Sequence, residues 1–106
     1  MKLYIKRKSK MIEAVAEYDF ENGSVTVLKG STVSSTIAHS EKFRGAKSIE
    51  KSRSEYVENG IVIKDAYFKS ASTAANFVTG SSTNGLTAWK DESGNTLQLI
   101  LKEGQQ

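Results

Sequence analysis

The chain, residues 1–106, predicts one small α+β domain with about five mostly antiparallel strands and two helices packed on one side of the sheet. Three observations predict this class. Residues 12–20 alternate apolar and polar side chains, which is typical of a half-buried strand. Residues 43–57 and 70–79 carry apolar side chains at helical spacing. Asn22-Gly23 and residues 93–95 are turn signals, which predict two antiparallel hairpins.

The first hairpin joins the strand of residues 12–20 to the residues that follow Gly23, and residues 3–5 indicate a short strand before it. Asn22-Gly23 favours a two-residue type I′ turn because both residues tolerate positive φ. Such a turn would place Phe20 opposite Val25 and Tyr18 opposite Val27. The apolar residues of the first strand then share one face: Ile12, Ala14, Ala16, Tyr18 and Phe20.

The first helix is expected over residues 43–57, after a polar loop at residues 30–41. Ser40 is its candidate N-cap and Asn59-Gly60 its stop, while Arg53 interrupts the apolar stripe. The β-branched residues 61–63 then indicate a short strand.

The second helix is expected to begin at Ser70 or Ser72 and to end at Gly80. Its apolar stripe consists mostly of small side chains, which let a helix lie close to a sheet: Ala71, Ala74, Ala75 and Val78. Residues 86–90 and 96–101 are expected to be the strands of the last hairpin.

Composition excludes several kinds of site. The chain has no cysteine, which excludes disulfides, cysteine-ligated metals and a cysteine nucleophile. Its single histidine, His39, lies in the polar loop without a partner that the sequence can place, so no catalytic residue, metal or cofactor is predicted. No apolar run is long enough to span a membrane, and the basic N-terminus lacks the apolar stretch of a signal peptide, so a cytoplasmic protein is expected.

The net charge of +3 is unevenly distributed. Five cations and no acid occupy the first ten residues: Lys2, Lys6, Arg7, Lys8 and Lys10. Such asymmetry favours an anionic partner such as nucleic acid, and Lys6, Arg7, Lys8 and Lys10 are the candidate phosphate contacts. On a regular strand Lys6, Lys8 and Lys10 would point the same way. The alternative is a strand edge decorated with lysine for solubility.

Trp89 is the one tryptophan, and it permits two interpretations. A buried tryptophan would anchor the second helix, whereas an exposed one could stack on a nucleic-acid base. Ser70, Ser72 and Asn84 surround it in sequence and are further candidates for phosphate contact, although caps and turns use the same residue types.

A family resemblance rests on residues 68–80 (FKSASTAANFVTG), 83–90 (TNGLTAWK) and 27–31 (VLKGS). Over residues 14–101 the chain resembles a small bacterial domain of unknown function that is typically found C-terminal to GIY-YIG-type nuclease domains and beside restriction–modification methyltransferase components. It departs from that pattern at Ala71, where the family has proline, and at Leu86, where relatives often carry an aromatic residue. The helix-to-tryptophan segment also resembles the RAMA domain of restriction and methylation systems.

The resemblance implies a non-catalytic accessory module, facing DNA and partnered with a nuclease or methyltransferase. A protein-interaction module that tethers an enzyme without touching nucleic acid is the alternative. An enzyme is a third interpretation, which no catalytic constellation in the sequence favours. Salt dependence separates the first two, because phosphate contacts weaken steeply with salt and an apolar tether does not.

Overall fold

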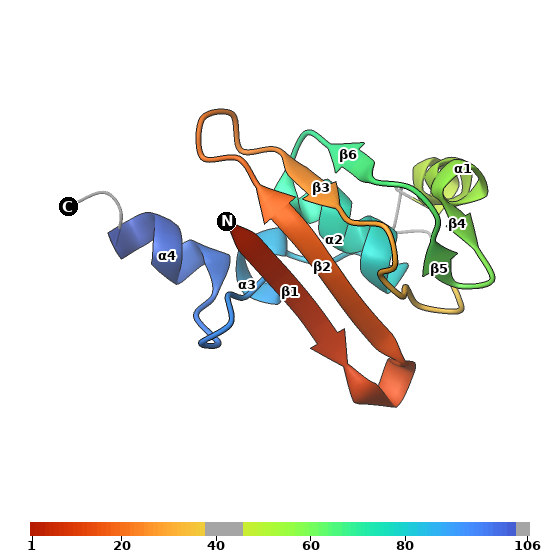
Figure 1. The fold of residues 1–106 in the computed structure, drawn as a ribbon, viewed down its shortest axis with the longest axis horizontal. Helices are drawn as coiled ribbons and strands as arrows, with labels where there is room; N and C mark the ends of the chain where they lie inside the picture. The colour runs from red at the N-terminus through yellow and green to blue at the C-terminus, as the bar shows by residue number, and fades with distance from the viewer. Residues whose placement is uncertain (38–45, 104–106) are drawn as a thin grey trace.

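The computed structural model describes residues 1–37 and 46–103. The strands are β1 (Lys2–Arg7), β2 (Ile12–Tyr18), β3 (Val25–Val27), β4 (Val57–Glu58), β5 (Ile61–Val62) and β6 (Ala66–Phe68). The helices are α1 (Ala46–Tyr56), α2 (Ala71–Thr79), α3 (Gly85–Ala88) and α4 (Leu97–Glu103), with a 3₁₀ turn η1 (Lys8–Lys10). A four-stranded antiparallel sheet has the order β1-β2-β3-β6, and β4 and β5 form a separate pair (Figure 1). The predicted α+β class with an antiparallel sheet is confirmed.

Strand alternation gives the sheet one buried face. Leu3 and Ile5 of β1 lie on it with Ile12, Ala14 and Ala16 of β2, and each is at most 3% exposed. Lys2, Tyr4 and Lys6 alternate with the buried residues of β1 and lie on the open face.

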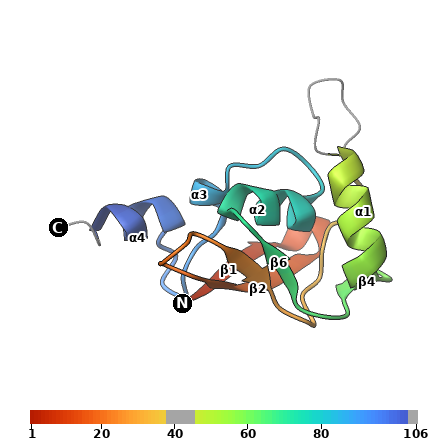
Figure 2. The same ribbon diagram turned by 90° about the horizontal axis from the view of Figure 1, so that it is seen from above.

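Helix α2 covers the buried face, as Figure 2 shows, with α1 beside it. The Ser70 hydroxyl caps α2 by accepting the Thr73 N–H at 3.2 Å, and Gly80 ends it with φ +74°. Ala74 and Ala75 are fully buried. The predicted second helix, its cap and its small apolar stripe are therefore confirmed.

The first hairpin has a longer loop than predicted. Tyr18 pairs with Val25 rather than with Val27, a shift of two residues that leaves the paired residues of β2 and β3 on their expected faces. Gly23 alone has positive φ in this loop, so Asn22-Gly23 does not form a type I′ turn. Side-chain acceptors shape the loop instead, because Asp19 Oδ1 accepts the Glu21 N–H and Asn22 Oδ1 the Ser24 N–H. Phe20 falls in this loop and is 59% exposed, so its predicted inward position was wrong.

The other Asn-Gly pair forms the two-residue turn. Asn59 and Gly60 have φ of +52° and +77°, and they join β4 to β5 with Val57 opposite Val62. Helix α1 therefore ends earlier than predicted, at Tyr56, and not at the Asn-Gly stop. The expected N-cap, Ser40, lies outside the described residues.

The predicted last hairpin was wrong, because its two strands are the helices α3 and α4. Helical spacing explains α4, since Leu97 is buried and Ile100 half-buried, whereas Leu99 is 41% exposed. The Thr96 hydroxyl accepts the Leu99 N–H at 3.3 Å and starts this helix. The turn at residues 93–95 does exist, between the bridged residues Lys90 and Thr96.

Thr32 joins the small hairpin to the main sheet. It forms isolated bridges to Glu13 of β2 on one side and to Ile61 of β5 on the other. The Glu13 N–H is 2.8 Å from the Thr32 hydroxyl, and the Thr32 N–H is 2.9 Å from the Glu13 carbonyl. The β4-β5 hairpin consequently lies beside the end of the sheet where β1 turns into β2.

Candidate nucleic-acid interface

The end of the β1-β2 hairpin, residues 6–11, is named here the basic tip. Strand β1 stops at Arg7, and the 3₁₀ turn η1 reverses the chain. Met11 closes the turn with φ +56°, and its N–H donates to the Lys8 carbonyl at 3.2 Å. The regular strand expected through Lys10 was wrong, because β1 stops at Arg7, so strand alternation does not set the direction of Lys8 and Lys10.

The cations of the basic tip are available to a ligand. Lys6, Lys8 and Lys10 are exposed and Arg7 is half-buried. Lys6 lies over the Tyr4 ring at 5.3 Å, and Glu13 is opposite it on β2. The ion pairs between described residues, Met1 with Glu17 and Lys64 with Glu55, involve none of these four cations.

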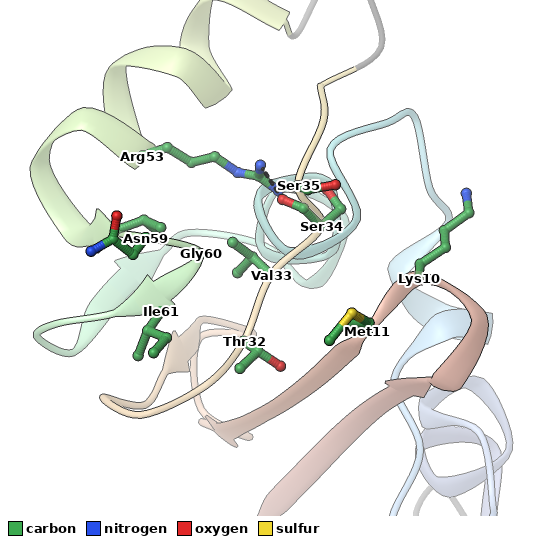
Figure 3. Close-up of a pocket in the computed structure, with 11 residues that line it drawn as sticks. Lys10, Met11, Thr32, Val33, Ser34, Ser35, Arg53, Asn59, Gly60 and Ile61 are labelled. Carbon is green, nitrogen blue, oxygen red and sulfur yellow. Dashed lines mark hydrogen bonds between the residues drawn. The ribbon is translucent and has the colours of Figure 1, made fainter.

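A cleft of about 590 Å³ lies beside the basic tip, and Figure 3 shows it. It is named here the Arg53 cleft. Lys10 and Met11 border it on the side of the tip, and Arg53 borders it on the side of α1. No acidic side chain lines it within residues 1–37 and 46–103. The remaining polar lining consists of hydroxyls and one amide: Thr32, Ser34, Ser35 and Asn59.

Arg53 is held rigidly. Its Nη1 donates to the Ser34 carbonyl at 2.7 Å, and its Nη2 donates to the Ser34 hydroxyl at 2.8 Å. Nε and Nη2 donate to the Phe77 carbonyl at 3.1 and 2.9 Å, and Nη2 also lies 3.2 Å from the Val78 carbonyl. These carbonyls belong to the last turn of α2, so Arg53 caps that helix. Burial lowers the pKa of Arg53 below its ordinary value.

A second hollow, of about 460 Å³, lies on the other side of Met11. It is named here the Lys8 hollow. Lys6 and Lys8 line it together with Glu13, and it shares Met11 and Thr32 with the Arg53 cleft. The basic tip is therefore bordered by two hollows, each with two cations in its lining.

The predicted polar candidates near Trp89 serve the fold. Ser70 caps α2, Ser72 Oγ accepts the Gly85 N–H at 3.1 Å, and Asn84 Oδ1 caps α3 by accepting the Leu86 N–H at 2.9 Å. A Cβ on Gly85 would collide with the Ala71 carbonyl group, so only glycine permits this approach of α3 to α2.

These polar residues lie far from the basic tip along the sheet. Strand β6 ends at Phe68, which pairs with Val25, and Val25 in turn pairs with Tyr18. Tyr18 lies beside Met1, whereas the basic tip follows the pair of Arg7 with Ile12 at the other end of β2. The two groups of predicted phosphate contacts are thus not brought together.

Trp89 is completely buried, and its Nε1 donates to the Ala71 carbonyl at 2.9 Å. It ends α3 instead of lying on a strand, and it belongs to the same core as Ala74 and Ala75. The anchoring interpretation is confirmed. A stacking platform would need an exposed ring face, which this side chain does not have.

Sequence reasoning missed two residues of this surface. Met11 carries no motif, and its exposure follows from the 3₁₀ turn. Arg53 interrupts the apolar stripe of α1 and is half-buried, and a cation within an apolar helical stripe is the signal that could have identified it. His39 lies outside the described residues.

The residues described contain no group of three or more His, Cys, Asp or Glu side chains placed to hold a metal ion. Within the same residues, every helix is too short or too polar to cross a membrane.

No curated protein matches the chain, and no solved structure does. A family model does match, and it covers residues 3–101, which adds β1 to the region 14–101 that carried the resemblance. That model is described as a domain of unknown function (DUF4357), and the chain belongs to this family.

Proposed function

We propose that this domain is a non-catalytic accessory module that binds nucleic acid through phosphate contacts of the basic tip. One observation carries the proposal: the tip gathers Lys6, Arg7, Lys8 and Lys10 on a hairpin end, and none of these four side chains forms an ion pair with a carboxylate of the described residues. Arginine and lysine side chains without internal partners are the groups that contact the phosphate backbone.

The Arg53 cleft supports the proposal. It continues the polar surface from Lys10, and its lining contains the exposed hydroxyl of Ser35, the exposed amide of Asn59 and no acidic side chain of the described residues. These are the side chains that donate hydrogen bonds to phosphate oxygens.

The resemblance to domains that accompany nucleases and restriction–modification methyltransferases suggests the kind of enzyme with which the module acts. In this proposal the module places such an enzyme on DNA in the bacterial cytoplasm. Because of the resemblance to the RAMA domain, the proposal includes modified DNA as a ligand, and its affinity should be compared with that of unmodified DNA.

Titration of fluorescently labelled duplex and single-stranded DNA tests the proposal. We expect saturable binding at low salt, about micromolar or weaker because few cations contribute. A variant with Lys6, Arg7, Lys8 and Lys10 replaced by glutamine should bind all sequences more weakly. Its salt dependence should also flatten, by about 0.9 in log–log slope for each phosphate that the variant no longer neutralises.

The matched control replaces four other exposed lysines by glutamine: Lys29, Lys47, Lys69 and Lys102. Both variants lose four charges, so a general effect of net charge would weaken them equally. Equal weakening, or no saturable binding by the unmodified protein, contradicts the proposal.

A tethering module is the second candidate, and exposed apolar side chains at the far end favour it. Leu86 on α3 and Leu99 on α4 are 38% and 41% exposed on two helices in contact with each other. Figure 1 shows α4 extending away from the sheet at this end. Binding of a partner enzyme that is insensitive to salt and lost in Leu99→Asp would support this function instead.

A further inference from the structure

Met11 is the most exposed large apolar residue among those described, at 83%. Its backbone has φ +56°, a conformation that residues other than glycine rarely adopt. A single exposed apolar side chain is ordinary. One that is held in a strained conformation at the centre of a cationic surface points to a functional role.

The surroundings of Met11 are cationic on both sides. The Lys8 hollow brings Lys6 and Lys8, together with the single acid Glu13, to one side. The Arg53 cleft brings Lys10 to the other side, while Arg53 across the cleft is bound to carbonyls of Ser34 and of α2. Both hollows share Met11 and Thr32 in their lining, so Met11 lies at the border between them. Figure 3 shows Met11 beside Lys10 at one border of the cleft, facing Arg53 across it.

The shape of this end also matters. Figure 1 shows the β1-β2 hairpin reaching beyond β3 and β6, and β3 indeed pairs only with residues 16–18 of β2. A projecting two-stranded ribbon is an element that DNA grooves admit.

We propose that Met11 is an apolar wedge that the ribbon inserts against the bases of duplex DNA, while Lys6 and Lys8 on one side and Lys10 on the other contact the two phosphate strands. This inference rests on the proposed function and adds to it the duplex as ligand and a residue that contacts bases. Exposed lysines on both sides of one apolar side chain match a duplex groove, which has a phosphate strand on each side. A methionine side chain makes no hydrogen bond that reads sequence, and it acts by unstacking a base step.

The test uses a short duplex that carries 2-aminopurine, whose fluorescence rises when the base unstacks. The unmodified protein should raise the fluorescence on binding. Met11→Ala should abolish that rise and weaken duplex binding about fivefold, which corresponds to about 1 kcal/mol. Its salt dependence and its affinity for single strands should not change, because all phosphate contacts remain.

Met11→Lys separates the wedge from electrostatics. It adds a cation at the tip, so it should keep or improve low-salt affinity and still lose the fluorescence rise. Leu86→Ala is the matched control, since it removes an exposed apolar side chain from α3 and should behave as the unmodified protein.

Failure of this inference and failure of the proposed function give different results. Duplex binding that depends on the four tip cations, with a fluorescence response unaffected by Met11→Ala and Met11→Lys, overturns the wedge alone. Absence of saturable DNA binding by the unmodified protein overturns both.

Discussion

Trp89 connects α3 to α2 through one hydrogen bond and the packing of its buried ring. Its indole ends α3, and its Nε1 reaches the Ala71 carbonyl in the first turn of α2. The first N–H groups of a helix have no partner within it, whereas a carbonyl of the first turn ordinarily accepts a hydrogen bond within the helix. The bond from the indole to the Ala71 carbonyl is therefore an additional hydrogen bond, and it connects α3 to α2. Sequence alone could favour burial of this ring, but it could not supply the partner, because the pattern of residues 86–90 also fits a strand.

Replacing Trp89 by alanine should lower the free energy of unfolding by about 3 kcal/mol or more, because a large core cavity remains. Trp89→Phe keeps most of the apolar contact and should cost about 1–2 kcal/mol, the loss of the hydrogen bond plus imperfect packing. Chemical denaturation followed by circular dichroism measures both. Phe20→Ala removes an exposed ring and serves as the control. A Trp89→Ala variant as stable as this control would show that the ring is not a core anchor.

At the scale of elements, the connection between α3 and α4 depends on one carboxylate. Asp91 Oδ1 accepts the N–H groups of Asn95 and Ser93, each at 2.9 Å, and Oδ2 accepts from the Asn95 amide at 3.2 Å. The Asn95 backbone bond, then its side-chain bond, hold the pKa of Asp91 below its ordinary value. The ionised form therefore favours the folded turn, which orients α4.

This shift predicts a pH effect of definite sign. A carboxyl group with a lower pKa in the folded state binds fewer protons folded than unfolded, so its contribution is present above the unfolded pKa of about 3.9. That contribution disappears as the pH falls through the folded-state pKa. Asp91→Asn should destabilise the protein at neutral pH and flatten the loss of stability below about pH 5. Thermal unfolding from pH 2 to pH 7 measures this, and parallel curves for both proteins would contradict it.

The two Asn-Gly pairs show what local sequence can predict about elements. Both favour a two-residue turn, yet only Asn59-Gly60 forms one. At Asn22-Gly23 the carboxylate of Asp19 and the amide of Asn22 accept backbone N–H groups and stabilise a longer loop. The two-residue turn and the longer loop with side-chain acceptors are alternatives, and tertiary packing decides between them. The local sequence pattern does not contain that information.

The prediction of strands in place of the C-terminal helices was wrong for a related reason. Leu97, Leu99 and Leu101 alternate, which fits a strand, but Leu97, Ile100 and Leu101 also fit a helix at i, i+3 and i+4. Short apolar segments permit both periods, and the Thr96 and Asn84 caps decide for helix. Segments with a single consistent period, β2 and α2, were predicted correctly.

On the scale of the whole molecule, the exposed cations and the polar residues that cap helices lie at different ends of the sheet. The basic tip and the Arg53 cleft lie at one end of the sheet, and the caps around Trp89 serve the start of α2 near the other end. The sequence could identify both groups of polar residues, but their distance depends on strand order and direction. A stretch of lysines can be identified in the sequence, whereas the cleft assembles from the tip, residues 32–35, Arg53 of α1 and the β4-β5 hairpin.

Because the two groups of polar residues lie at opposite ends of the sheet, substitutions in them should affect different properties of the protein. Ser72→Ala and Asn84→Ala remove acceptors that hold α3, so each should lower the free energy of unfolding by about 1 kcal/mol. Neither should change affinity for DNA, because the proposed contacts lie at the other end of the sheet. Lys8→Gln should weaken DNA binding and change the free energy of unfolding by no more than about 0.5 kcal/mol. The reason is that Lys8 is exposed and lacks a side-chain partner among the described residues. Paired denaturation and fluorescence titration of the three variants test this. Weaker DNA binding by Asn84→Ala at unchanged stability would move the interface to the tryptophan end, and the basic tip would then be the lysine-decorated strand edge.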